Sequence, residues 1–253
     1  MIPGLAHVHG LGVSPGDDTL YAATHFGLWR IPSKGEPRRV GKYAHDLMGF
    51  SVIGADHFIA SGHPNSARDL PPHLGLIEST DAGQTWESVS RMGESDFHIL
   101  RSGDRRTYGW SSTSGTLAVT TDHTTWTERD GIDLVDLVID PKDDQSILAT
   151  VAVSDTELAL RSSDDGGRNW NELEAPVGFV RLNWPEDGAP WGVAEDGRVF
   201  SRDGDDWSEQ GRLDGTPEAI TSDATSWFAA AGGAIHRSRD DGRTWDVVVE
   251  YDA

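Results

Sequence analysis

The chain of 253 residues has 42 acidic against 21 basic side chains, a formal net charge of −21, ten tryptophans and no cysteine. The absence of cysteine excludes disulfides, thiolate metal ligands and cysteine nucleophiles. The negative charge argues against nucleic acid or an anionic membrane as the main partner, and no stretch approaches the ~18 apolar residues of a membrane span.

In chain order, the predicted elements are short strands that recur in one sequence of four. A first strand, such as 9–15 or 134–141, is followed by a second, such as 19–24, 57–62 or 146–153. The third strands are predicted at 27–31, 74–80, 115–121, 157–163, 197–202 and 234–239. A turn then leads into a fourth strand, which begins at Trp86, Trp126, Trp170, Trp207 or Trp245.

The turn before the fourth strand has a repeated motif, S-x-D-x-G-x-T/N-W. It is nearly complete at 79–86, 163–170 and 238–245, shorter at 120–126 and 201–207, and eroded at 29–37. Four strands in each unit of roughly 40 residues are typical of propeller blades. We therefore predict an all-β, six-bladed β-propeller with four-stranded antiparallel blades. It forms one domain, 1–253, with blades at approximately 1–40, 41–91, 92–130, 131–175, 176–213 and 214–253.

The turn motif resembles the Asp-box, or BNR repeat. Proteins with this repeat include sialidases, other glycoside hydrolases, sortilin-type receptors and a photosystem II assembly factor. Strings such as HVHGLGVSP, FIASGHP and LGLIESTDAGQTW resemble bacterial proteins catalogued as glycosyl-hydrolase-like or exo-sialidase-like. The resemblance implies a glycoside hydrolase or a protein-interaction scaffold, although a fold does not determine a function.

The motif residues themselves are predicted to be structural. Their Asp side chains accept backbone N–H bonds within the turn, their Gly residues supply positive φ, and their Trp side chains pack between sheets. These are Asp81, Asp165 and Asp240 with Gly83, Gly167 and Gly242. The WRIP string at 29–32 resembles the arginine motif of sialidases, but Arg30 occupies an ordinary third-strand position. No Tyr/Glu nucleophile pair is evident around Tyr21, Tyr43, Tyr108 or Tyr251.

Histidine is concentrated in the first three predicted blades, with eight of the ten between residues 1 and 98. Aligning the first strands places Met48 and His98 at the position of His9, and places Asp46 and Asp96 at that of His7. Blades 4 to 6 have Val135, Phe179 and Pro217 at the position of His9. Turns between second and third strands lie at the same mouth of the channel. The predicted metal ligands are His9, His25, Met48, His63 and His98, with His7, Asp46 and Asp96 as outer partners.

Imidazole and thioether together indicate a transition metal, either zinc or copper, and Met favours Cu(I). Ligands of one ion would have to converge within ~4–5 Å. Alternatively, these are polar channel residues that bond to water or to one another. The other histidines, His45, His57, His73, His123 and His236, are assigned no function. No nucleotide or organic cofactor is expected.

Acidic residues give a second, weaker set of candidates. Asp46, Asp96 and Glu94 are the catalytic candidates for glycoside hydrolysis, which needs two carboxyl groups, and Asp69 lies in the long loop 63–75. The prolines of this loop restrict it, so that it is either a wall or lid of a site or an insertion without function.

The first hypothesis is therefore a non-enzymatic protein that binds a metal ion or small ligand at the channel mouth. The alternatives are an exo-sialidase-like glycoside hydrolase and a scaffold with a protein partner. We expect neither nucleic-acid binding nor membrane insertion. The N-terminal sequence has no visible signal peptide, while the missing cysteines and acidic surface suit a secreted or cell-envelope protein and equally a cytoplasmic one.

Overall fold

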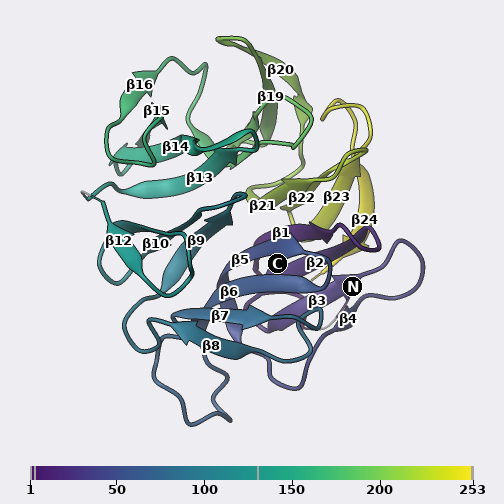
Figure 1. Cartoon of the computed structure of the whole chain (residues 1–253). Helices are drawn as coiled ribbons and strands as arrows, with labels where there is room; N and C mark the ends of the chain where they lie inside the picture. Colours follow the sequence, from purple (N-terminus) through teal and green to yellow (C-terminus); the bar gives the residue numbers. More distant parts are fainter. Residues whose placement is uncertain (1, 3, 130, 252–253) are drawn as a thin grey trace. The chain divides into compact units, whose positions relative to one another are not determined.

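The computed structural model describes residues 2, 4–129 and 131–251. Among these residues the helices and strands assigned are all β-strands (Figure 1). These strands form six antiparallel sheets of four strands each. The predicted fold class, an all-β six-bladed propeller, is confirmed. The described residues contain no helix with the length and apolar character needed to cross a membrane.

The chain divides into two compact units, the first ending at Arg129. The first unit contains three sheets, and their strands are β1 Val8–Ser14, β2 Thr19–Thr24, β3 Gly27–Ile31, β4 Arg38–Arg39, β5 Asp46–Gly54, β6 His57–His63, β7 Leu76–Ser79, β8 Glu87–Ser90, β9 Phe97–Ser102, β10 Thr107–Ser111, β11 Thr116–Thr120 and β12 Trp126–Glu128. Within this unit β1 packs beside β5, and β5 packs beside β9, as the first strands of successive blades do.

The second unit contains the other three sheets. Their strands are β13 Leu134–Asp140, β14 Asp143–Ser154, β15 Glu157–Ser163, β16 Asn171–Leu173, β17 Phe179–Asn183, β18 Trp191–Ala194, β19 Arg198–Asp203, β20 Asp206–Arg212, β21 Pro217–Ser222, β22 Trp227–Ala231, β23 Ala234–Ser238 and β24 Asp246–Glu250. All six sheets fall within the predicted blade boundaries. The assignment of residues 1–253 to a single domain remains a prediction.

The hydrophobic core lies between neighbouring sheets of each unit. In the first unit Tyr21 of β2 contacts Phe58 of β6 with ring centroids 4.8 Å apart, and both rings are almost fully buried. In the second unit Trp191 stacks on Trp227 at 4.3 Å. Burying aromatic rings between sheets is the main favourable term for holding successive blades together.

The turns between third and fourth strands have the predicted hydrogen bonds. Asp81 Oδ1 accepts the backbone N–H of Thr85 at 2.8 Å, and the Ser79 hydroxyl accepts the N–H of Gly83 at 2.8 Å. The same bonds recur around Asp165 and Asp240. The glycines of these turns have φ near +80°, as predicted: Gly83 +82°, Gly167 +81° and Gly242 +83°. The motif acids are therefore structural.

A β-bulge interrupts the first strand of every sheet, where the pairing register with the second strand shifts by one residue. The bulged residues are His9, Met48, His98, Val135, Val180 and Glu218. The predicted equivalence of His9, Met48 and His98 is thus confirmed. The prediction was wrong by one residue in the last two blades, where Phe179 and Pro217 pair normally with Ala194 and Ala231.

Candidate metal centres

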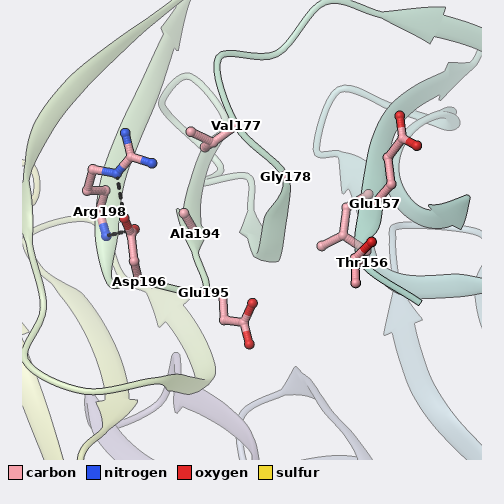
Figure 2. Close-up of a pocket in the computed structure, with 9 residues that line it drawn as sticks. Thr156, Glu157, Val177, Gly178, Ala194, Glu195, Asp196 and Arg198 are labelled. Carbon is pink, nitrogen blue, oxygen red and sulfur yellow. Dashed lines mark hydrogen bonds and ion pairs between the residues drawn. The ribbon is translucent and has the colours of Figure 1, made fainter. Parts of the chain in front are cut away.

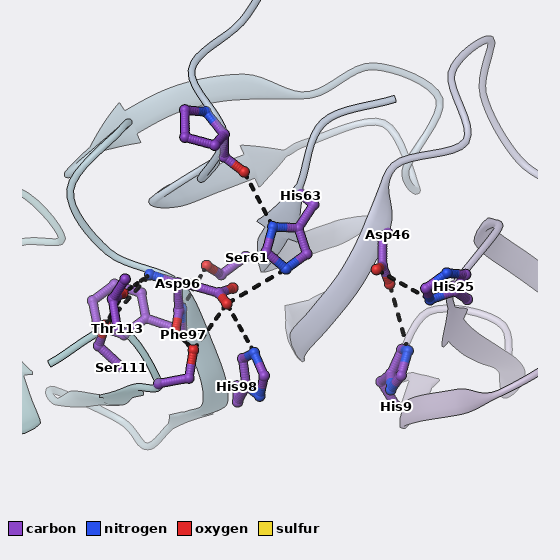
Figure 3. Close-up of polar contacts among 12 residues, drawn as sticks. His9, His25, Asp46, Ser61, His63, Asp96, Phe97, His98, Ser111 and Thr113 are labelled. Atoms are coloured by element: carbon purple, nitrogen blue, oxygen red, sulfur yellow. Dashed lines mark hydrogen bonds and ion pairs between the residues drawn. The ribbon is translucent and has the colours of Figure 1, made fainter. Parts of the chain in front are cut away.

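Two clusters of histidine and aspartate lie in the first unit, at the end of the blades where the first strands begin (Figure 3). We define site A as His9, His25 and Asp46, and site B as His63, Asp96 and His98. Within each site the candidate ligand atoms all lie within 4.8 Å of one another. Each site is therefore compact enough for its three side chains to bind one ion.

Site A joins the first and second sheets. His9 is the bulged residue of β1, His25 follows the end of β2, and Asp46 begins β5. The Asp46 carboxylate lies between the two imidazoles, with Oδ1 3.5 Å from His9 Nε2 and Oδ2 3.1 Å from His25 Nδ1. A bulge can re-aim a side chain, which explains how β1 presents His9 to a residue of the neighbouring sheet.

Site B joins the second and third sheets in the same manner. His63 ends β6, Asp96 immediately precedes β9, and His98 is the bulged residue of β9. Asp96 Oδ2 lies 2.8 Å from His98 Nε2 and 3.5 Å from His63 Nε2. The Asp96 side chain is only 5 % exposed, so this carboxylate forms the buried floor of the site.

Neighbouring groups orient the ligands of site B. His63 Nδ1 lies 3.1 Å from the carbonyl oxygen of Pro72. A carbonyl oxygen can only accept a hydrogen bond, so Nδ1 carries the proton and donates it to this bond. That bond leaves Nε2 of a neutral His63 imidazole with a free lone pair on the side of Asp96. The Ser112 hydroxyl donates to Asp96 Oδ2 at 2.9 Å. Such outer hydrogen bonds fix the tautomer and direction of metal ligands in many metal sites.

Burial and hydrogen bonding act in opposite directions on the Asp96 carboxyl. Burial alone would raise the pKa of Asp96, but the hydrogen bond and charge of His98, the Ser112 hydroxyl and the charge of His63 together lower it below its ordinary value. Asp96 is therefore ionised near neutral pH. This is the form that a metal ligand requires, and a poor proton donor for glycoside cleavage.

Several buried polar atoms in the two sites have no hydrogen-bond partner. They are His9 Nε2 and Asp46 Oδ1 in site A and Asp96 Oδ1 in site B. Buried polar atoms without partners are costly, and they commonly mark a position where an ion or water binds. The 3.5 Å separations found once in each site are too long for a hydrogen bond but match the ~3.4 Å edge of a tetrahedron with metal–ligand bonds of ~2.0–2.1 Å.

The structure divides the predicted ligands into two groups. His9 and His25 lie together in site A, and His63 and His98 lie together in site B. Met48 is the half-buried bulged residue of β5, the strand between β1 and β9. Asp46 and Asp96, expected as outer partners, lie among the candidate ligand atoms themselves.

The other residues considered in the sequence lie outside site A and site B. His7 is exposed, and its ring centroid lies 6.2 Å from that of His25. Glu94 and Asp69 are exposed and belong to neither cluster. Arg30 bonds to Asp17 at 2.9 Å and Thr19 at 3.0 Å, so its strand role is structural.

Most other histidines have hydrogen-bond partners outside these sites. His45 accepts the N–H of Asn65, His57 contacts Glu78, His123 contacts Thr107 and His236 contacts the carbonyl of Ala231. His73 is different, because its ring lies 5.6 Å from that of His63 and its buried Nδ1 has no hydrogen-bond partner. No sequence pattern predicts this contact, since it depends on the path of loop 63–75.

The second unit has a pocket of about 500 Å³ beside the turns that follow β14 and β18 (Figure 2). Glu157, Glu195 and Asp196 are among the residues that line it. Asp196 is bonded to Arg198, with its Oδ2 2.8 Å from the guanidinium Nε. These three acids were not among the predicted site residues.

No protein-family model matches the sequence, and no curated protein is significantly similar to it. Solved structures of similar fold include a GH74 enzyme of Niastella koreensis, with 14 % identity and a TM-score of 0.69 over 98 % of this chain and 46 % of that chain. This chain thus spans about half the length of the enzyme.

YCF48 bound to D1 peptide is also similar, with 16 % identity, a TM-score of 0.60 and coverage of 98 % and 82 %. The nidogen/laminin complex gives 14 % identity, a TM-score of 0.73 and coverage of 90 % and 92 %. At these identities the likenesses show the fold alone, and that fold is shared by glycoside hydrolases and by proteins that bind other proteins.

Proposed function

We propose that this propeller binds first-row transition-metal ions at site A and site B and serves as a metal-binding protein. The observation that carries the proposal is the carboxylate held between two imidazoles, which occurs twice with ligand atoms within 4.8 Å. Two imidazoles and one carboxylate suit Zn²⁺, Fe²⁺ and Cu²⁺ better than Ca²⁺ or Mg²⁺, which prefer oxygen ligands. In site A the unpartnered buried atoms, His9 Nε2 and Asp46 Oδ1, face each other at 3.5 Å, which supports the same conclusion.

Both sites follow one construction, which supports binding at two places rather than a chance pairing of histidines. In each, a histidine from the end of a second strand faces an aspartate at the start of the next sheet. The third ligand comes from a bulged position, His9 of the earlier sheet in site A and His98 of the later sheet in site B. Met48 occupies the bulged position between them.

Metal content after equilibrium dialysis against Zn²⁺ or Cu²⁺ tests this proposal. We expect two equivalents for the wild type, one each for His9→Ala and His98→Ala, and none for the double variant. His57→Gln is the matched control, because His57 begins β6, at the opposite end of that strand from His63, and contacts Glu78 of β7. Equal metal uptake by the double variant and the wild type would refute the proposal.

A glycoside hydrolase is the second candidate function. Its candidate site is the pocket of the second unit rather than site A or site B of the first unit. Glu157 and Glu195 are among the residues that line this pocket, and glycoside hydrolysis requires two carboxyl groups. A GH74 enzyme shares the fold. Screening aryl-glycosides and sialosides with the wild type, Glu157→Gln and Glu195→Gln tests this function, and turnover that both variants retain would exclude these acids.

A protein partner is the third candidate, because similar folds include YCF48 bound to D1 peptide and the nidogen/laminin complex. Val247 and Val248 of β24, the last strand of its sheet, are 56 % and 37 % exposed. An exposed apolar edge strand can pair with another chain. Val247→Lys should weaken such binding in a pull-down without changing metal content.

A further inference from the structure

Both sites bring together three candidate ligands, and site B is the one whose carboxylate is buried and supported by an outer hydrogen bond. Site B is therefore the better candidate for a centre that binds a ligand on its metal, an inference that rests on the proposed metal binding there. Three observations carry it: the number of protein ligands, the exposure of the imidazoles and the burial of Asp96.

The first observation is the number of ligands. Among the described residues, site B brings together three candidate ligands, which are two imidazoles and one carboxylate. Structural zinc sites are closed by four protein ligands, whereas zinc sites with three protein ligands keep a position for water or substrate. Two histidines and one carboxylate are also the donor set of Fe²⁺ sites that leave positions open for exogenous ligands.

The second observation is the unequal exposure of the three ligands. The Asp96 side chain is 5 % exposed, while those of His63 and His98 are 40 % and 34 % exposed. An ion held by these groups would have the carboxylate below it and solvent on the side where both imidazoles are open. That side is where a small molecule would approach the ion.

The third observation is that the protein ligands are already held in place. Pro72 orients His63, and Ser112 holds the carboxylate oxygen of Asp96 that faces both imidazoles. Asp96 itself is fixed through its backbone N–H, which faces the hydroxyls of Ser111 and Thr113 at 3.4 and 3.2 Å. Preorganised ligands lose little conformational entropy when the ion binds, which favours binding by these three groups.

We propose that the ion in site B keeps an open coordination position that binds a small anionic or neutral ligand in exchange for water. The ligand class is a compact oxygen or nitrogen donor, because it must fit between two exposed imidazoles. Azide is a suitable probe.

The test uses the full chain loaded with Co²⁺, whose visible spectrum reports the number and kind of its ligands. The His9→Ala variant removes site A, so that its single Co²⁺ reports on site B. Azide should change this spectrum saturably, with one azide bound for each Co²⁺. His57→Gln should respond like the wild type.

Two failures are distinguishable. If His9→Ala takes up no Co²⁺, or if His9→Ala/His98→Ala takes up as much, the proposed metal binding at site B is wrong and this inference fails with it. If His9→Ala binds one Co²⁺, loses it on the further change His98→Ala, and its spectrum does not respond to azide, the metal site stands. In that case its coordination is closed and the inference is overturned.

Discussion

Asp46 and Asp96 occupy equivalent positions two residues before the bulge of successive first strands, and each carboxylate lies between two imidazoles. Their surroundings nevertheless differ. The Asp46 side chain is 17 % exposed and faces His25, which is 50 % exposed, whereas Asp96 is buried and bonded to Ser112. The same construction therefore yields a more open site A and a better supported site B, which should bind an ion first.

Removing the support of Asp96 should weaken site B selectively. In Ser112→Ala the carboxylate loses a hydrogen bond of 2.9 Å, and loss of such an outer partner typically lowers metal affinity roughly 10–100-fold. Calorimetric titration with Zn²⁺ should show one weakened step and one unchanged step. Ser114→Ala in the same turn is the control, and an equal effect of both variants would exclude the support assigned to Ser112.

Met48 should distinguish copper from zinc. It is the bulged residue of β5, between the sheets that supply His9 and His98, and its thioether prefers Cu(I). Met48→Leu keeps an apolar side chain of similar volume. The variant should lose Cu(I) affinity in a competition titration with a chromogenic chelator and retain its Zn²⁺ affinity. Unchanged Cu(I) affinity would remove Met48 from the ligand set.

The fold was predictable from the sequence because its signals are local. The turn around Asp81, Gly83 and Trp86 carries its own hydrogen bonds, so its repetition marks each blade without knowledge of distant contacts. The error at Phe179 and Pro217 has a physical cause. A bulge adds one residue to the strand and breaks its period of two, so an apolar pattern alone cannot locate it.

The candidate site was less predictable, because it depends on distances between sheets. Alignment of the first strands predicted that His9 and His98 are equivalent, and both are bulged residues in the structure. They nevertheless lie in different clusters, because the distance between neighbouring sheets determines which side chains meet. The same separation brings Asp46 and Asp96 among the ligand atoms. His73 was missed because only the folded loop 63–75 brings its ring to His63.

The turn glycines should tolerate alanine unequally. Gly83 has φ +82°, and an added Cβ would clash with the Leu28 side chain in the core. Gly115 has φ +63° and open space around the added atom. Left-handed backbone costs an alanine about 1–2 kcal/mol at either position, and overpacking adds about 1–3 kcal/mol at Gly83 only. Urea unfolding of Gly83→Ala and Gly115→Ala should therefore differ by the packing cost, and equal losses would contradict the Leu28 clash.

Acid should destabilise the protein through its turn aspartates. Thr244 donates to the Asp240 carboxylate from its hydroxyl at 2.7 Å and from its backbone N–H at 2.9 Å. The Thr244 hydroxyl, its N–H and further turn donors lower the pKa of Asp240 from 3.8 to about 2. The hydrogen bonds of their own turns also lower the pKa values of Asp81, Asp122 and Asp165 below the ordinary value.

A carboxyl with a lowered folded-state pKa stabilises the fold fully above its unfolded-state pKa, and this contribution is lost as the pH falls through the folded-state pKa. For Asp240 the loss should occur between about pH 4 and pH 2. Thermal unfolding across this range should show a smaller fall in midpoint for Asp240→Asn than for the wild type, because the amide does not titrate there. Asp164→Asn, an exposed neighbour of Asp165, is the control. If Asp240→Asn and the wild type lose the same number of degrees, Asp240 does not contribute to acid sensitivity.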